Sequence, residues 1–153
     1  MRLAIETGRR ARVWSSPNPA VGCVIVKSNE VLATGFTHPT GQAHAEVHAL
    51  SQIADATGST VYVTLEPCAH TGRTPPCSQA LIDAGVARVV IGCIDPDERV
   101  AGTGVEQLRS AGIDVTLGVC EAEAADELAG FFQRLKRGYG RVTVKMAMSA
   151  DGR

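Results

Sequence analysis

The sequence predicts an α/β protein in which a mixed β-sheet is flanked by helices. Two observations lead to this fold class. Near the N-terminus, two neighbouring segments rich in β-branched residues are separated by turn residues, which is typical of a β-hairpin. After this hairpin, helical and strand-like segments alternate, which favours parallel strands joined by helical crossovers. The chain has 153 residues, about the length of one domain.

The first half of the chain supplies the hairpin and its flanking helices. Residues 1–15 have apolar positions suited to a helix, and the prolines Pro17 and Pro19 end it because proline excludes continued helix. Turn residues at 27–30 join the two hairpin strands. The expected elements are a helix over 1–15, strands over 21–26 and 31–37, and a helix over 43–56.

The second half alternates strands with helices. Gly85 and Gly112 each follow a helical segment, where glycine commonly ends a helix. Apolar residues at three- and four-residue spacing predict one long helix over 121–136. The expected elements are strands over 60–65, 88–94 and 114–117, helices over 78–84, 105–111 and 121–136, a linker at 138–140, and a last strand over 142–148 that has no evident partner.

The overall composition excludes several classes of protein. The formal net charge is −1, with 15 basic and 16 acidic residues, so a general nucleic-acid binder or a binder of anionic membranes is not expected. The sequence contains no apolar run near the ~18 residues of a transmembrane helix and no signal peptide at its start, so we expect a cytoplasmic protein. Its five cysteines are odd in number and predict core thiols or metal ligands rather than a disulfide framework.

Three short motifs carry chemistry. His44 and Glu46 lie at the start of a predicted helix, Cys68 follows a strand within Glu-Pro-Cys, and Cys77 begins the next helix. One imidazole and two thiolates are ligands that Zn²⁺ prefers. Three protein ligands leave a fourth position for water, which is typical of catalytic zinc sites. The three residues therefore predict a catalytic zinc centre.

Glu46 is predicted to move protons rather than to bind the metal. Two residues along a helix correspond to ~200° of rotation, so His44 and Glu46 would not share a helix face. Zinc lowers the pKa of its bound water toward ~7 and makes hydroxide available as a nucleophile. A nearby carboxylate can take the proton and return it to a leaving amine. This is the chemistry of zinc deaminases, whose usual Pro-Cys-x-x-Cys spacing is here lengthened to eight residues between Cys68 and Cys77.

The same residues carry a closer resemblance. The strings TLEPCAHTGRTPPC (64–77), PNPAVGCVIV (17–26), HAEVHAL (44–50) and DPDERVAGTG (95–104) are similar to the deaminase domain of the bifunctional riboflavin-biosynthesis deaminase/reductase. The resemblance implies a three-layer α-β-α cytidine-deaminase-like fold with one Zn²⁺ per chain. It further implies hydrolytic deamination of 2,5-diamino-6-ribosylamino-4(3H)-pyrimidinone 5′-phosphate, a phosphoribosylated pyrimidine, as well as association into a homo-oligomer.

The resemblance also assigns residues. His44, Cys68 and Cys77 match the zinc ligands and Glu46 the proton shuttle, and the substrate-pocket positions are Asn18, His70, Arg73 and Asp95. Three positions depart from the usual pattern of the family: Thr37 stands where a His is common, Asp97 replaces an Asn, and Thr103 replaces a Lys. If that Lys attracts phosphate, this protein depends more on Arg73.

The resemblance suggests a division of the chain. Residues 1–140 would form the deaminase domain, and residues 141–153 would be a stub of the first strand of a reductase domain that is otherwise absent. The reductase cofactor site cannot be built from so few residues. We therefore expect no NADPH binding by this chain.

The same residues also allow other interpretations. The substrate could be a free nucleoside, another base or a tRNA, although a tRNA-editing enzyme normally has a basic surface. His70 or His48 could close the zinc site and make it structural. Cys68 and Cys77 could form a redox pair, although their spacing is unlike the thioredoxin motif. His48 is otherwise expected to be a core histidine, Asp95 a turn residue and Arg73 a solvated one.

Overall fold

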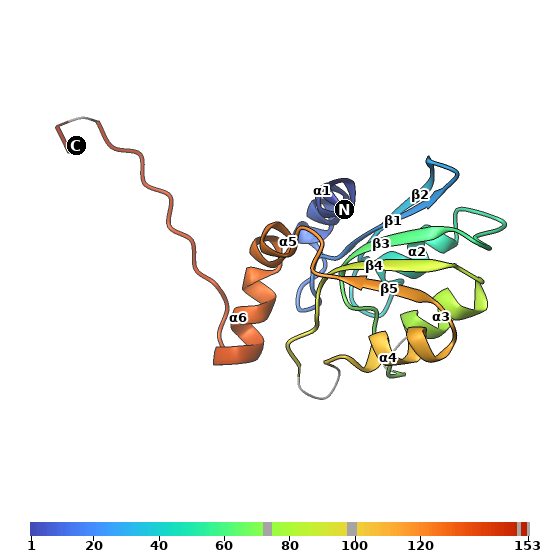
Figure 1. Ribbon diagram of the computed structural model, residues 1–153. Coiled ribbons are helices and arrows are strands. Elements are labelled where there is room, and N and C mark those ends of the chain that lie inside the picture. Colours follow the sequence, from blue (N-terminus) through green and yellow to red (C-terminus); the bar gives the residue numbers. More distant parts are fainter. Residues whose placement is uncertain (72–74, 98–100, 150, 153) are drawn as a thin grey trace.

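The computed structural model describes residues 1–71, 75–97, 101–149 and 151–152 (Figure 1). Most expected elements appear within two or three residues of their predicted bounds. In chain order the elements are α1 (Arg2–Arg9), the 3₁₀-helix η1 (Arg10–Val13), β1 (Gly22–Lys27), β2 (Glu30–Phe36), α2 (Ala45–Leu50), β3 (Thr60–Leu65), α3 (Cys77–Asp83), β4 (Arg88–Cys93), α4 (Thr103–Ser110), β5 (Asp114–Leu117), α5 (Glu121–Glu127) and α6 (Ala129–Arg137).

The strands of the described residues form one five-stranded sheet in the order β2-β1-β3-β4-β5. β1 pairs antiparallel with both β2 and β3, whereas β3 pairs parallel with β4 and β4 with β5. The antiparallel part is the predicted hairpin, and the parallel part comes from the βα units that follow it. The predicted mixed sheet is therefore confirmed.

Helices cover both faces of this sheet. A Cβ atom on Gly22 of β1 would collide with α1, and one on Gly35 of β2 would collide with α2. Gly22 pairs with Phe36, the neighbour of Gly35, and successive residues of a strand point to opposite faces. α1 and α2 therefore lie on opposite sides, α1 together with α5, and α2 together with α3 and α4 (Figure 1). This is the expected three-layer α-β-α arrangement.

The core between these layers consists mainly of aliphatic side chains. The strands contribute Val61, Val63, Val89 and Ile91, all fully buried. Cys23 and Cys93 are buried in strands with free thiols, as expected for packing residues. The parts of the chain that the structure describes contain no helix of the length and apolarity that a membrane crossing requires.

Three predicted helices differ from the structure. The helix expected over 1–15 is α1 followed by the 3₁₀-helix η1, which ends at Val13. The helix expected over 43–56 is only α2, and turns follow it to residue 59. The helix expected over 121–136 is two helices, α5 and α6, separated at Leu128 with φ −96° and ψ 3°. Leu128 is 2% exposed, so the break places it in the core and lets α6 leave the direction of α5. The periodicity of the side chains continues across the break, which is why the sequence predicted one helix.

The last expected strand, over 142–148, is also not observed. Residues 141–149 have no regular secondary structure, and Val142 and Met146 are more than three-quarters exposed. Figure 1 shows this segment as an extended chain beyond α6. An extended segment becomes a strand only through hydrogen bonds to a neighbouring strand, and none of the described strands pairs with it.

Candidate metal centre and active site

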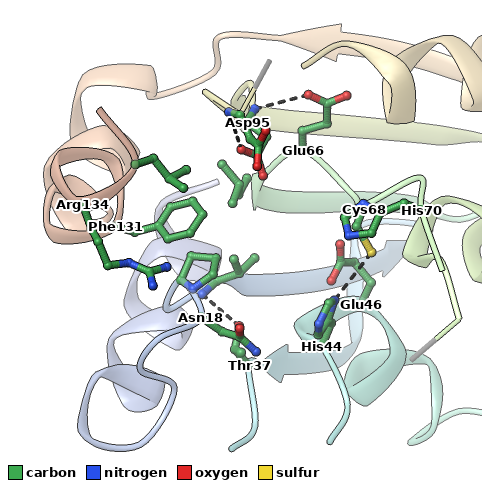
Figure 2. A pocket seen from close by; sticks show the side chains of 15 residues that line it. Asn18, Thr37, His44, Glu46, Glu66, Cys68, His70, Asp95, Phe131 and Arg134 are labelled. Atoms are coloured by element: carbon green, nitrogen blue, oxygen red, sulfur yellow. Dashed lines mark hydrogen bonds between the residues drawn. The ribbon is translucent and has the colours of Figure 1, made fainter. Parts of the chain in front are cut away.

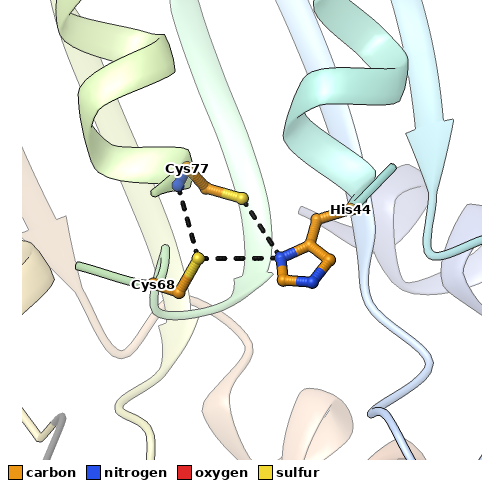
Figure 3. Close-up of side chains that lie close together, drawn as sticks. All are labelled: His44, Cys68 and Cys77. Carbon is orange, nitrogen blue, oxygen red and sulfur yellow. Dashed lines mark hydrogen bonds between the residues drawn. The ribbon is translucent and has the colours of Figure 1, made fainter. Parts of the chain in front are cut away.

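His44, Cys68 and Cys77 come together at one end of the sheet. His44 directly precedes α2, Cys68 lies in the loop after β3, and Cys77 is the first residue of α3. The His44 Nδ1 atom lies 3.3 Å from the Cys77 Sγ atom and 3.6 Å from the Cys68 Sγ atom (Figure 3). Their possible ligand atoms all lie within 4.8 Å of one another. No further His, Cys, Asp or Glu of the described residues joins this group.

Gly35 sets the position of the helix that carries His44 and Glu46. A Cβ atom at Gly35 would overlap the carbonyl oxygen of Ala45 and lie 2.5 Å from the backbone nitrogen of Ala49. Only glycine therefore lets α2 approach β2 this closely. Because Ala45 lies between His44 and Glu46, this contact fixes both side chains relative to the sheet.

The donor set fits a zinc ion. In a tetrahedral zinc site, a sulfur and a nitrogen ligand lie about 3.6 Å apart, which is close to the two distances from His44 Nδ1. The backbone N–H of Cys77 donates to the Cys68 Sγ atom at 3.3 Å, which favours a thiolate. A hydrogen bond from the Cys77 side chain, with a weaker one from His44, lowers the pKa of Cys68 well below its usual range. A thiolate is the form that binds metal.

Glu46 lies beside this group as a buried acid (Figure 2). Its side chain faces the pocket, and the residue is only 4% exposed. Burial, which disfavours the ionised form, and then the negative charge of Cys68 raise the pKa of Glu46 to about 7. A carboxyl group of this kind can both accept and donate a proton near neutral pH.

A pocket of about 460 Å³ opens over Glu46. It gathers His44, Glu46 and Cys68 together with three of the residues predicted to bind substrate, namely Asn18, His70 and Asp95. Cys77 is fully buried and does not line the pocket. The fourth predicted substrate residue, Arg73, lies outside the described residues.

The Asp95 side chain takes part in a turn and lies at the pocket. Its Oδ1 atom accepts a hydrogen bond from the backbone N–H of Asp97 at 2.9 Å, which makes it a turn residue, and its side chain also lines the pocket. Partial burial raises the pKa of Asp95, and the charges of Asp97 and Glu66 act in the same direction.

Glu66 has a structural position that the sequence analysis did not identify. Its buried carboxylate accepts four backbone hydrogen bonds, from Asp95 and Gly102 at Oε2 and from Gly104 and Val105 at Oε1, at 2.9–3.2 Å. These four hydrogen bonds connect the end of β3 to the segment that carries Asp95 and to the start of α4. An acidic residue directly after a buried strand was the available sequence signal.

Helix α6 contributes side chains that the sequence analysis also missed. Phe131, Arg134 and Leu135 line the pocket, and Figure 2 shows Phe131 and Arg134 on the side away from His44 and Glu46. No sequence pattern indicated this position, because a single long helix was expected where α5 and α6 are separate.

His48 does not contribute to the candidate metal centre. Its Nδ1 atom lies 3.2 Å from the backbone nitrogen of Phe36 and 3.2 Å from the Nε2 atom of His38. Burial, and then the proximity of His38, lowers the pKa of His48. His48 therefore packs against β2, and it does not close the group of three ligands. His70, the other residue considered for that role, lines the pocket and lies outside the group as well.

Comparisons with known proteins agree with this geometry. Residues 1–93 match the family model described as the cytidine and deoxycytidylate deaminase zinc-binding region. The chain is 49% identical over 154 residues to the riboflavin biosynthesis protein RibD of Escherichia coli (strain K12), which covers all of this chain and 42% of that protein. The chain thus spans about two fifths of the length of the curated relatives it matches.

Solved structures show the same similarity. Acinetobacter baumannii RibD, form 2, is 50% identical with a TM-score of 0.91, over 99% of this chain and 43% of that one. A diaminohydroxyphosphoribosylaminopyrimidine deaminase/5-amino-6-(5-phosphoribosylamino)uracil reductase from Thermotoga maritima is 40% identical with a TM-score of 0.86, over 90% of this chain and 40% of that one. The described sheet and helices are therefore those of a known deaminase fold.

Proposed function

Since the chain belongs to the family of cytidine and deoxycytidylate deaminases with a zinc-binding region, we propose that it catalyses the hydrolytic deamination of 2,5-diamino-6-ribosylamino-4(3H)-pyrimidinone 5′-phosphate in riboflavin biosynthesis. The substrate class comes from the similarity to RibD proteins. The observation that carries the chemistry is the buried Glu46 next to the group of His44, Cys68 and Cys77 at the floor of a pocket.

His44, Cys68 and Cys77 would hold one Zn²⁺. When bound there, zinc acts as a Lewis acid and makes water a nucleophile at neutral pH. The number of ligands and their position at the pocket support a catalytic rather than a structural role for the metal. Three protein ligands would leave a fourth position for water, and two of them, His44 and Cys68, line the pocket.

Glu46 would carry the proton. In the overall reaction, water adds to the ring carbon that bears the amino group, the C–N bond breaks, and a carbonyl and ammonia form. The Glu46 carboxylate takes a proton from water and delivers it to the departing nitrogen. Its burial suits both steps, because its pKa of about 7 balances the two protonation states near neutral pH.

The remaining pocket residues would bind the pyrimidine. The Asn18 amide both donates and accepts hydrogen bonds, and His70 and Asp95 add further polar groups from two other loops. The pocket volume of about 460 Å³ lies within the range of small-molecule sites, ~300–1,000 Å³. This size supports a small pyrimidine nucleotide as the substrate.

The function is tested by ammonia release from this substrate with purified, zinc-loaded protein, compared with Glu46→Ala and with Glu30→Ala as a control at an exposed glutamate of β2. We expect Glu46→Ala to lower the rate by ~10²–10⁴-fold, the usual contribution of a general acid–base group, with the zinc content retained. Glu30→Ala should keep the wild-type rate. Undiminished activity in Glu46→Ala would rule out the assigned role.

The choice of substrate needs a separate comparison. Cytidine, cytosine and tRNA are offered in competition with the phosphoribosylated pyrimidine. We expect none of them to be deaminated at a comparable rate. Preferential deamination of any one of them would replace the proposed substrate while leaving the zinc chemistry intact.

A further inference from the structure

We propose that Arg134 on α6 binds the phosphate group of the substrate and makes the enzyme prefer phosphorylated over unphosphorylated pyrimidine ribosides. This inference rests on the proposed function, since it extends the same pocket. It assigns to α6 a role that the similarity in the metal-binding motifs does not include.

Arg134 lies across the pocket from the candidate metal centre. Figure 2 shows Phe131 and Arg134 of α6 on one side of the pocket and His44, Glu46 and Cys68 on the other. The ring carbon that reacts must lie near Glu46, so the rest of the substrate extends across the pocket. The 5′-phosphate of the ribose would then lie at the side of the pocket that α6 forms.

The charges of the residues that line the pocket favour Arg134 as the partner of a phosphate. Four carboxylate side chains line the pocket, those of Glu46, Glu66, Asp95 and Asp97, and they disfavour a phosphate that carries nearly two negative charges. Among the described residues that line the pocket, Arg134 alone carries a guanidinium or ammonium group. The electrostatic attraction for a phosphate in this pocket is therefore strongest at the side that α6 forms.

The Arg134 side chain is already held in place before a ligand binds. Its Nη2 atom donates to the carbonyl oxygen of Pro17 at 2.7 Å, and its Cζ atom lies 5.7 Å from the centre of the Phe131 ring. A guanidinium has five N–H donors in a planar fork, so this one bond does not exhaust them. A group fixed before binding loses less conformational entropy when the phosphate arrives.

The contact with Pro17 also connects this position to the pyrimidine. Pro17 precedes Asn18, whose side chain lines the pocket between α6 and the metal centre. One loop thus carries a residue for the base and an acceptor for the arginine. The distance between the two ends of the pocket would then select ligands in which base and phosphate are separated by one ribose.

The test measures ammonia release from the phosphorylated substrate and from its dephosphorylated form. The variants are Arg134→Ala, Arg134→Gln, which keeps an amide donor for Pro17, and Arg137→Ala as the control. Arg137 is an exposed arginine of the same helix that does not line the pocket. Melting temperatures report whether each variant is folded.

For both Arg134 variants we expect kcat/KM on the phosphorylated substrate to fall by at least about tenfold, mainly through KM, because the charged hydrogen bond between the guanidinium and the phosphate is lost. On the dephosphorylated substrate kcat/KM should stay within about twofold of wild type, and Arg137→Ala should match wild type on both. Equal losses on the two substrates would show a merely structural role and overturn the inference. An unchanged preference for the phosphorylated form would overturn it as well.

Failure of the proposed function is distinguishable from failure of this inference. A wild-type protein that releases no ammonia from either compound contradicts the function. Equilibrium binding of ribose 5-phosphate to wild type and to Arg134→Gln then decides the inference, which requires a loss of at least about tenfold in affinity. Equal affinity of the two proteins would overturn it.

Discussion

The Sγ atom of Cys77 lies 3.3 Å from the Nδ1 atom of His44, although the two residues are 33 positions apart in the chain. The two residues sit at the starts of α3 and α2, which pack side by side on the same face of the sheet. The distance between these helix starts therefore depends on how each helix packs on its strands. The candidate metal centre is a product of the tertiary structure, and changes in helix packing should affect it as directly as changes of the ligands.

Cys77→Ser should greatly reduce zinc binding. A serine hydroxyl is a harder and much less acidic ligand than a thiol, so the site loses one of its two soft donors. We expect well under one zinc per chain after dialysis, measured by metal analysis. Cys120→Ser is the matched control, since Cys120 is a free thiol that does not belong to the group. A full equivalent of zinc in Cys77→Ser would contradict the assigned ligand set.

Gly35→Ala should lower both stability and activity. The added methyl group would overlap the Ala45 carbonyl oxygen, so α2 must shift together with His44 and Glu46. Overpacking of this kind costs about 1–3 kcal/mol, which thermal unfolding and the rate of ammonia release would both detect. Gly140→Ala is the control, because a Cβ atom at Gly140 meets nothing within 4 Å. A Gly35→Ala protein with wild-type melting temperature would show that the close approach of α2 is not required.

Glu66→Gln should destabilise the protein by about 1–3 kcal/mol. The amide NH₂ group cannot accept the backbone hydrogen bonds that one carboxylate oxygen now accepts, so two backbone N–H groups lose their acceptor. The segment that carries Asp95 should also be held less firmly, which predicts a higher KM. Denaturant unfolding and steady-state kinetics measure the two effects. Glu106→Gln, at an exposed glutamate in the first turn of α4, should change both far less.

Asp95→Asn should stabilise the protein at neutral pH while it weakens catalysis. Burial, with the charges of Asp97 and Glu66, raises the pKa of Asp95 in the folded state above its unfolded value near ~3.9. The ionised form is therefore unfavourable in the fold, and the wild type loses stability as the pH rises through the folded pKa.

The melting temperature of Asp95→Asn should consequently exceed that of wild type at pH 7, and the difference should shrink toward zero at a pH below the unfolded pKa. Asn keeps an oxygen that accepts the hydrogen bond from the Asp97 N–H. The variant and the wild type therefore differ mainly in the negative charge at residue 95. A difference that does not change with pH would contradict this account.

Local patterns determined much of the fold. The hairpin, the strand at Thr60–Leu65 and the start of α3 near Cys77 followed from β-branched runs, turn residues and glycine stops, which act over a few neighbouring residues. The candidate ligands His44, Cys68 and Cys77 were identified from residue type and order, because thiolate and imidazole chemistry is a property of the side chains themselves.

The break at Leu128 and the missing strand over 142–148 could not be predicted in this way. The helix is interrupted at Leu128, whose side chain packs in the core. This packing depends on the sheet beneath α5. Residues 142–148 have the composition of a strand, but a strand also needs a partner at hydrogen-bonding distance.

By itself, the sequence determined the chemistry of this protein, since a histidine, two cysteines and a glutamate carry the same reactivity wherever the chain places them. Only the tertiary structure decided which groups surround that chemistry. It buried Glu46 and so raised its pKa to about 7, used Glu66 to hold the Asp95 segment, and brought Arg134 of α6 to the pocket. Burial, hydrogen-bond partners and distances between remote segments arise from packing, and packing is fixed only when the whole chain is folded.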